Sequence, residues 1–259
     1  MEMKFKFKII QSLFNQRVKK IVRANNYKKI VFFSVLSSLF LSSCDQFNSS
    51  FRRGISEGVI NYKISFPNAG RDQMMTSLLP EKMVYTFKDN NSVAEFETIG
   101  GVFTSRTVAI QDSLLVNSYL KLFKKKIVLQ LDETGLETML SEQPAMTIID
   151  TDIMDTIAGY LCRKAIVVYD DISIPEINLY YTEKIDFKEP NWCNQYRDID
   201  GILLSYEIEQ FGIRMRFDAT SVEEVKVENS VFSSIKDFKV VSFEEMKVEM
   251  EKIISTFNM

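Results

Sequence analysis

The sequence contains no histidine, which limits the kinds of catalysis that this chain could support. Ser-His-Asp and Cys-His nucleophiles, histidine-bound zinc and the usual general base near neutral pH are therefore excluded. Two S-x-x-K patterns, which begin at Ser118 and Ser233, match a serine–lysine nucleophile. Neither begins at a plausible helix start, and the companion S-D-N and K-T-G elements are missing. We predict no catalytic residue and no cofactor, with a histidine-free enzyme as an unfavoured alternative.

Neighbouring carboxylates are the second candidate for chemistry. Residues 150–155 (DTDIMD) resemble the start of a calcium loop, but the central glycine and the glutamate at position 12 of such loops are missing. Asp198 and Asp200 stand before Gly201, where an Asp-Gly turn is the simpler interpretation. We expect a solvated loop and a turn at these places, and we predict no metal ligand.

Cys44 has a sequence context that points to lipid attachment. Residues 1–30 are rich in lysine and arginine, and an apolar run over 30–41 leads to Leu41-Ser42-Ser43-Cys44. This arrangement is typical of a secretory signal, and the run falls short of the roughly 20 residues that a spanning helix needs. The last four residues resemble the lipobox read by lipoprotein signal peptidase. We therefore predict cleavage before Cys44 and anchoring to a bacterial envelope membrane by lipid on its thiol.

Cys162 and Cys193 are the two remaining cysteines. In an oxidising exported compartment they could form a disulfide, and closing a loop of about 32 residues would stabilise the fold by roughly 3–4 kcal/mol. Two buried thiols are the alternative, and the sequence leaves both open. The chain has no C-x-x-C motif, so redox catalysis is not expected.

Composition and charge divide the chain and restrict its partners. We predict a signal peptide over 1–43, a polar tether over 44–57 and a single β-rich domain over 58–259. Nine basic and one acidic residues lie in 1–43, which leaves 23 basic and 34 acidic residues and a net charge of −11 after cleavage. Nucleic-acid binding requires clustered lysine and arginine, so we expect no nucleic acid partner. The expected partners are the membrane, through the anchor, and a lipid or another envelope protein.

Hydrophobic residues alternate through most of the domain, which indicates β-strands. Residues 89–91 (DNN) predict a tight turn, and residues 210–212 close a hairpin. A short helix is expected over 134–141. A capping box, Ser242 with Glu245, starts a C-terminal helix over 243–257. Together these patterns predict a mainly β (α+β) domain, a single curved antiparallel sheet or half-barrel with a short internal helix and a C-terminal helix. The predicted strands are 59–66, 82–87, 92–99, 102–110, 114–120, 126–131, 160–169, 177–182, 202–210 and 213–222.

Two surface features have a functional and a structural interpretation. Lys121 with residues 124–126 (KKK) is the only basic cluster of the domain. It could contact anionic lipid headgroups, although a solvated turn is the favoured interpretation. Trp192 and Cys193 could form the rim of a cavity, and a loop packed on the sheet is the favoured alternative.

Residues 157–165 (IAGYLCRKA) resemble a motif of the GLPGLI family of Bacteroidetes envelope proteins and of related lipoprotein domains. Further matches follow in order at 180–182, 201–207 and 232–238, and residues 58–62 fit the opening, so the resemblance covers about 57–245. The chain departs from the eponymous Gly-Leu-Pro-Gly-Leu-Ile, because residues 199–202 (IDGI) stand there.

The resemblance implies a fold more than a chemistry, since the family has no assigned activity. Its architecture is similar to the half-barrel of LolA- and LolB-like carriers, which suggests lipid or lipoprotein handling by analogy of fold alone. We favour a non-catalytic envelope lipoprotein that binds an apolar ligand or a partner protein. A structural subunit of an envelope assembly is the first alternative. A lipid anchor in the outer membrane is the favoured location, with the leaflet left open.

Overall fold

The structure is a computed structural model that describes residues 54–67, 79–210 and 213–257, with all of their side chains except those of residues 99, 210 and 253–257. The chain divides into two units, residues 1–53 and 54–259, and every described residue belongs to the second. The predicted signal peptide and Cys44 lie outside the described residues.

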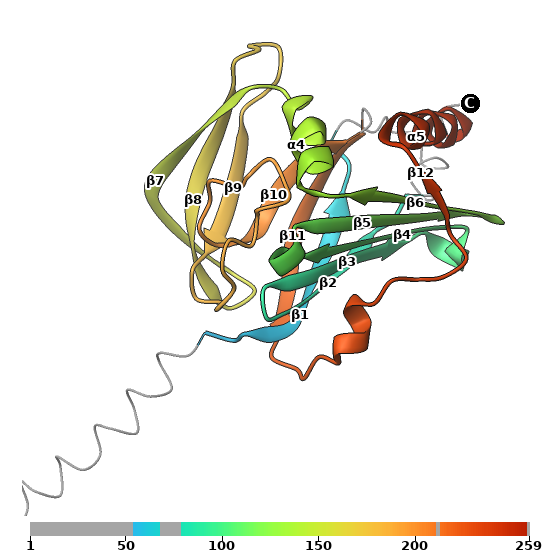
Figure 1. Ribbon diagram of the computed structural model, residues 1–259. Coiled ribbons are helices and arrows are strands. Elements are labelled where there is room, and N and C mark those ends of the chain that lie inside the picture. The colour runs from blue at the N-terminus through green and yellow to red at the C-terminus, as the bar shows by residue number, and fades with distance from the viewer. Residues whose placement is uncertain (1–53, 68–78, 211–212, 258–259) are drawn as a thin grey trace, which may run out of the picture. The chain divides into compact units, whose positions relative to one another are not determined.

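Twelve described strands build a single open, curved sheet in the order β12-β6-β5-β4-β3-β2-β1-β11-β10-β9-β8-β7 (Figure 1). Neighbouring strands are antiparallel except β12 and β6, which run parallel. The predicted mainly β, antiparallel fold is confirmed. The strands are β1 (Glu57–Ser65), β2 (Lys82–Lys88), β3 (Asn91–Glu97), β4 (Phe103–Ile110), β5 (Leu115–Leu122), β6 (Lys125–Leu131), β7 (Met146–Ile157), β8 (Tyr160–Tyr169), β9 (Ile177–Thr182), β10 (Ile202–Gln210), β11 (Ile213–Glu223) and β12 (Lys239–Val241).

The first strand lies inside the sheet and joins its two halves. β1 pairs with β2 on one side and with β11 on the other (Figure 1). Strands β1 to β6 follow one another as a meander, and β7 to β11 form a second meander. A Cβ atom at Gly58 would lie 2.4 Å from the carbonyl oxygen of Glu223, so glycine permits the close approach of β1 and β11.

Tight turns connect several neighbouring strands. Asp89 and Asn90, between β2 and β3, have φ values of 48° and 61°. Positive φ at both central residues is the geometry of a type I′ hairpin turn, whose twist matches that of the strands. Ala158 and Gly159, at φ 49° and 85°, join β7 to β8 in the same way. The motif at 157–165 therefore includes a hairpin turn, which is a structural reason for those residue types.

Two segments differ from the sequence prediction. Residues 150–155 were expected in a solvated loop, but they belong to β7, the edge strand, where the register with β8 shifts between Asp150 and Met154. Carboxylates and a bulge on an exposed edge discourage pairing with another chain, so an acidic sequence is compatible with a strand at this edge of the sheet. The predicted tether also ends earlier than expected, because Ile55 bridges Ile185 and β1 begins at Glu57.

Both predicted helices are present among the described residues. α4 (Glu133–Ser141) begins after Asp132, whose Oδ1 accepts from the backbone N–H of Gly135 at 2.9 Å. α5 (Phe243–Phe257) begins with the predicted capping box: Glu245 N donates to Ser242 Oγ at 3.2 Å, and Ser242 N donates to Glu245 Oε2 at 3.1 Å. No helix of the described residues is long and apolar enough to cross a membrane.

The buried core follows the period-two pattern of the strands. In β1, Ile60, Tyr62 and Ile64 are buried and their neighbours are more exposed. They belong to a cluster that extends over β2, β10 and β11. A second cluster joins β4, β5 and β6 to the two helices through Leu136 and Met246. The helices therefore cover the β4–β6 part of the sheet.

Candidate ligand pocket

A pocket of about 310 Å³ lies between the sheet and the two helices. Its floor is made mainly of alternate residues of β2 to β6, β10 and β11, while α4, α5 and residues 190–195 supply the walls. In β4, for example, every second residue from Phe103 to Ala109 lines it. Small-molecule pockets usually measure about 300–1,000 Å³ and are mostly apolar. The size and lining of this pocket therefore suit one small apolar molecule.

Small and hydroxylated residues on the pocket floor leave the space. Ala94 on β3 stands opposite Thr107 on β4, which in turn stands opposite Ser118 on β5. The hydroxyls of Thr107 and Ser118 are 3.3 Å apart. Larger side chains at these three positions would fill the hollow. The small size of Ala94, Thr107 and Ser118 therefore keeps the space open.

Two partly buried tyrosines, Tyr85 and Tyr206, add neutral hydrogen-bonding groups to the lining. Burial raises the pKa of Tyr85 well above its ordinary value, although a hydrogen bond with Ser92 opposes the shift. Burial also raises the pKa of Tyr206, with the nearby Tyr85 acting in the same direction. Both phenols therefore stay protonated near neutral pH and present no charge to the pocket.

The two helices close one side of the pocket. Met139 and Leu140 of α4 and Met246 and Met250 of α5 line it. Methionine is flexible and polarisable, so it adapts to ligands of different shape. Lys247 Nζ of α5 contacts Glu142 Oε2 after α4 at 2.8 Å, with both side chains partly exposed. This exposed ion pair is a weak link between the two helices.

Residues 189–199 form a loop that supplies another wall. Asn191, 4% exposed, donates through Nδ2 to the carbonyl oxygens of Ile199 and Gly201, each at 2.9 Å. Tyr196 is fully buried and its hydroxyl donates to the backbone oxygen of Glu207. These buried hydrogen bonds hold the loop, and Cys193 lines the pocket while Trp192 packs against the β4–β6 cluster. Cys193 thus contributes to a cavity, as one interpretation of Trp192 and Cys193 proposed, and Trp192 packs on the sheet, as the other proposed.

Cys162 and Cys193 are free thiols in the structure. Of the two alternatives left open by the sequence, the structure has the unbonded thiols and not the disulfide. Cys162 on β8 is fully buried in the cluster around β1, whereas Cys193 packs against the β4–β6 cluster. Separate packing sites explain why the two sulfurs are not bonded. Burial raises the pKa of Cys162 to about 11 and that of Cys193 to about 12.

We expect both thiols to react slowly with an alkylating reagent in the folded protein near neutral pH, because the thiolate is the reactive form. The rate should rise as the pH approaches 11, since a raised pKa delays ionisation to that range. Peptide mass spectrometry after unfolding without reductant should find both Cys162 and Cys193 alkylated. A peptide pair joined by these two sulfurs would contradict the prediction.

The serine–lysine patterns do not form nucleophile pairs. Ser118 lies in the pocket, but Lys121 is three residues further along β5, so their side chains point to opposite faces. Ser233 and Lys236 are both exposed. The basic cluster is partly neutralised, because Lys125 pairs with Glu249 of α5. Lys126 Nζ lies 5.6 Å from the ring centroid of Phe238.

Three of the five carboxylates singled out in the sequence line a second, polar hollow. Asp150, Asp198 and Asp200 line it together with Arg163 and Tyr181. The Tyr181 hydroxyl donates to Asp150 Oδ1 at 2.9 Å, and burial, followed by this hydrogen bond, raises its pKa to about 12. Among the described residues, no group of three or more acidic or cysteine side chains could hold a metal ion. The sequence did not reveal that these distant carboxylates share one hollow.

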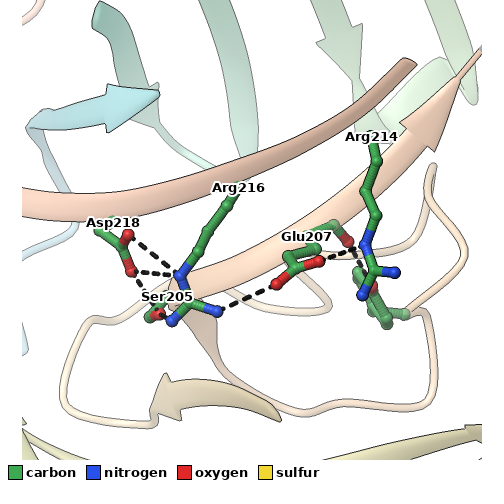
Figure 2. A network of polar contacts seen from close by, with 6 residues as sticks. Ser205, Glu207, Arg214, Arg216 and Asp218 are labelled. Atoms are coloured by element: carbon green, nitrogen blue, oxygen red, sulfur yellow. Dashed lines mark hydrogen bonds and ion pairs between the residues drawn. The ribbon is translucent and has the colours of Figure 1, made fainter. Parts of the chain in front are cut away.

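An ion-pair network occupies the residues of β10 and β11 that alternate with pocket-lining ones (Figure 2). Glu207, 8% exposed, accepts from Arg214 Nε and from Arg216 Nη1, the latter at 3.1 Å. Arg216 also donates to Asp218 Oδ2 at 3.1 Å and to Ser205 Oγ at 2.7 Å. Each buried charge is thus paired, which burial requires. The network links β10 to β11, the hairpin that supplies part of the pocket floor.

Comparisons with known proteins add little to this description. No family model matches the chain, and no curated protein sequence matches it. Among solved structures, the chain is similar to a β-barrel-like protein of domain of unknown function DUF1849 from Brucella abortus. The identity is 10% and the TM-score 0.27, over 67% of this chain and 99% of that one. A likeness at this TM-score supports no inference about function.

Proposed function

We propose that this chain is a non-catalytic envelope lipoprotein whose domain binds an apolar ligand in the pocket between the sheet and α4 and α5. The observation that carries the proposal is the pocket itself. It is mostly apolar, it measures about 310 Å³, and small residues at its centre keep it open. A purely structural subunit would gain stability from filling this space, because packed cores are more stable than cores with cavities.

The location in the proposal rests on the sequence around Cys44. Lipid on this cysteine would hold the domain at a membrane, with the outer membrane favoured, and the polar residues after it would act as a tether. The resemblance to GLPGLI-like envelope domains and the half-barrel analogy point in the same direction. We propose lipid or an apolar part of another envelope protein as the source of the ligand, and no nucleic acid partner.

A pocket-filling substitution tests the proposal. Ala94→Phe should place a ring over the pocket floor and lower the affinity for a neutral apolar fluorophore such as N-phenyl-1-naphthylamine by at least about tenfold, which corresponds to about 1.4 kcal/mol. The unaltered protein should also carry co-purifying lipid, detected by mass spectrometry, and the variant should carry less. Fluorescence titration gives the affinities.

Val84→Phe is the matched control, because Val84 is 39% exposed on β2 and does not line the pocket. It should leave fluorophore binding unchanged. Equal affinities of the two variants, both close to that of the original protein, would rule out ligand binding at this pocket and favour a structural role.

A further inference from the structure

The turn between β5 and β6 places an aromatic side chain in solvent. Leu122 pairs with Lys125, so Phe123 and Lys124 are the two residues of a tight hairpin turn, which follows the arrowhead of β5 in Figure 1. Phe123 is 67% exposed, although its neighbour Leu122 packs against the β4–β6 cluster. An exposed ring gives up the stabilisation that burial brings. The ring of Phe123 therefore adds little to the stability of the fold.

The backbone of this turn makes phenylalanine more unusual still. Phe123 has a φ of 51°, a conformation that glycine and asparagine adopt with little strain and bulky residues adopt rarely. Two-residue hairpin turns accordingly favour glycine, asparagine and aspartate. The β2–β3 hairpin follows this preference with Asp89 and Asn90. Phenylalanine at 123 is thus unfavourable both in backbone conformation and in exposure, and residues held in such conformations are frequent at functional sites.

Lysines surround the exposed ring. Residues 124–126 (KKK) follow it directly and are exposed, and Lys121 precedes it on β5. Lys125 pairs with Glu249 of α5, yet half of its side chain remains exposed. The chain after residue 43 is otherwise strongly acidic, with 34 acidic and 23 basic residues. A negatively charged surface would therefore be repelled by most of the domain and attracted at this hairpin.

We propose that the β5–β6 turn is a membrane-contact site. The Phe123 ring inserts at the headgroup level of a bilayer that contains anionic lipid, and the adjacent lysines lie against the lipid phosphates. Apolar rings beside lysines bind such interfaces, and each lysine near an anionic surface adds to the attraction. The sequence alone favours a solvated turn here, and the exposed ring changes that interpretation. The contact depends neither on lipid at Cys44 nor on a ligand in the pocket.

Cosedimentation with lipid vesicles tests the proposal. The sheet and its core lie within residues 54–259, so the chain is used from Asp45 onward, without the basic leader and the predicted anchor. It should bind vesicles of phosphatidylglycerol and phosphatidylcholine at least about tenfold more tightly than vesicles of phosphatidylcholine alone, a difference of about 1.4 kcal/mol. Binding to the anionic vesicles should weaken as the salt concentration rises, because salt screens exposed charges.

Two substitutions separate the ring from the charge. Phe123→Asn removes the ring and introduces a residue that accepts positive φ, so the fold should remain intact. Its affinity for the anionic vesicles should fall at least about tenfold, which corresponds to about 1.4 kcal/mol. Lys124→Glu should lower that affinity at least about fivefold, because it removes a cation and adds an anion. A thermal melting curve of each variant shows whether its fold is intact.

Ile172→Asn and Lys226→Glu are the matched controls. Ile172 is 99% exposed in the loop between β8 and β9, but Asp170 and Asp171 precede it, so anionic lipid should not attract this loop. Lys226→Glu makes the same change of charge close to Glu57, where β1 begins. Both controls should bind the anionic vesicles as the original chain does.

Several results would overturn the proposal. Equal binding to both kinds of vesicle, or binding to neither, would exclude an anionic bilayer as the partner and favour an acidic protein surface. Turn variants that bind the anionic vesicles as well as the original chain would show that the contact lies elsewhere. A loss in either control as large as in its turn variant would show that general apolar exposure or net charge causes the binding. Fluorophore binding in the pocket is measured without vesicles, so the proposed function is tested separately.

Discussion

Cys44→Ser is expected to remove the protein from the membrane fraction almost completely. A serine hydroxyl cannot replace the thiol to which lipid is attached, so the chain should be either unprocessed or released as a soluble form. One acyl chain gives only marginal membrane binding, and stable anchoring requires at least two, which makes the expected change close to all or none. Fractionation of cells, with labelled palmitate to follow acylation, measures it.

The other two cysteines provide the control for this experiment. Cys193→Ser should still incorporate palmitate and remain with the membrane, because Cys193 lies within the folded domain. A processed Cys44→Ser protein that stays in the membrane fraction after a salt wash would show that something other than lipid holds it there. The lipoprotein interpretation would then be wrong.

Glu207→Ala is expected to produce the largest loss of stability among changes of charged residues in the sheet. It leaves Arg214, whose side chain is only 9% exposed, without its carboxylate. Breaking a buried ion pair by removing one partner typically costs about 3–5 kcal/mol. For a domain of this size the melting temperature falls by about 2–4 °C per kcal/mol. Urea unfolding followed by circular dichroism measures the free energy directly.

Two further variants separate the buried charge from general damage to the hairpin. Asp218→Ala removes a carboxylate of the same network that is 43% exposed, and Arg216 keeps Glu207 and Ser205. Its cost should be about 0–1 kcal/mol, as for other exposed pairs. The double variant Glu207→Ala/Arg214→Ala should recover part of the loss, because no charge is left unpaired. Equal costs for Glu207→Ala and Asp218→Ala would contradict this account of the network.

Local signals predicted most of the fold. The alternation of hydrophobic residues predicted ten of the strands with approximate bounds. The pair Ser242 and Glu245 located the start of α5, because a capping box is recognised from the spacing of two residues alone. β7 was not predicted because it is an edge strand in which every residue is exposed or only partly buried, so its sequence lacks the alternation of a half-buried strand. β12 has three residues and depends on its parallel partner β6, which no local pattern reveals.

The candidate pocket was much harder to predict than the fold. Its lining comes from strands between 83 and 217, from both helices and from a loop, so the packing that forms it depends on tertiary structure. A curved sheet, or half-barrel, was expected from the sequence. The small residues that keep its centre open, such as Ala94 and Thr107, look like ordinary strand residues in the sequence. Cys193 was the one lining residue that the sequence placed at a cavity, and then only as an alternative.

The central position of β1 has a consequence for the order in which the chain can fold. Its partner β11 starts at Ile213, about 150 residues after β1, so this pairing must wait until nearly the whole domain has been made. Contacts between residues far apart in sequence slow folding, and strand edges left open during that time promote aggregation. The strands from β1 to β6 can pair progressively as they emerge, but one side of β1 stays open until the end. The sheet can therefore be completed only after its second half has been made. In a chain that stops before β11, β1 would be an unpaired edge strand, although it lies in the interior of the complete sheet.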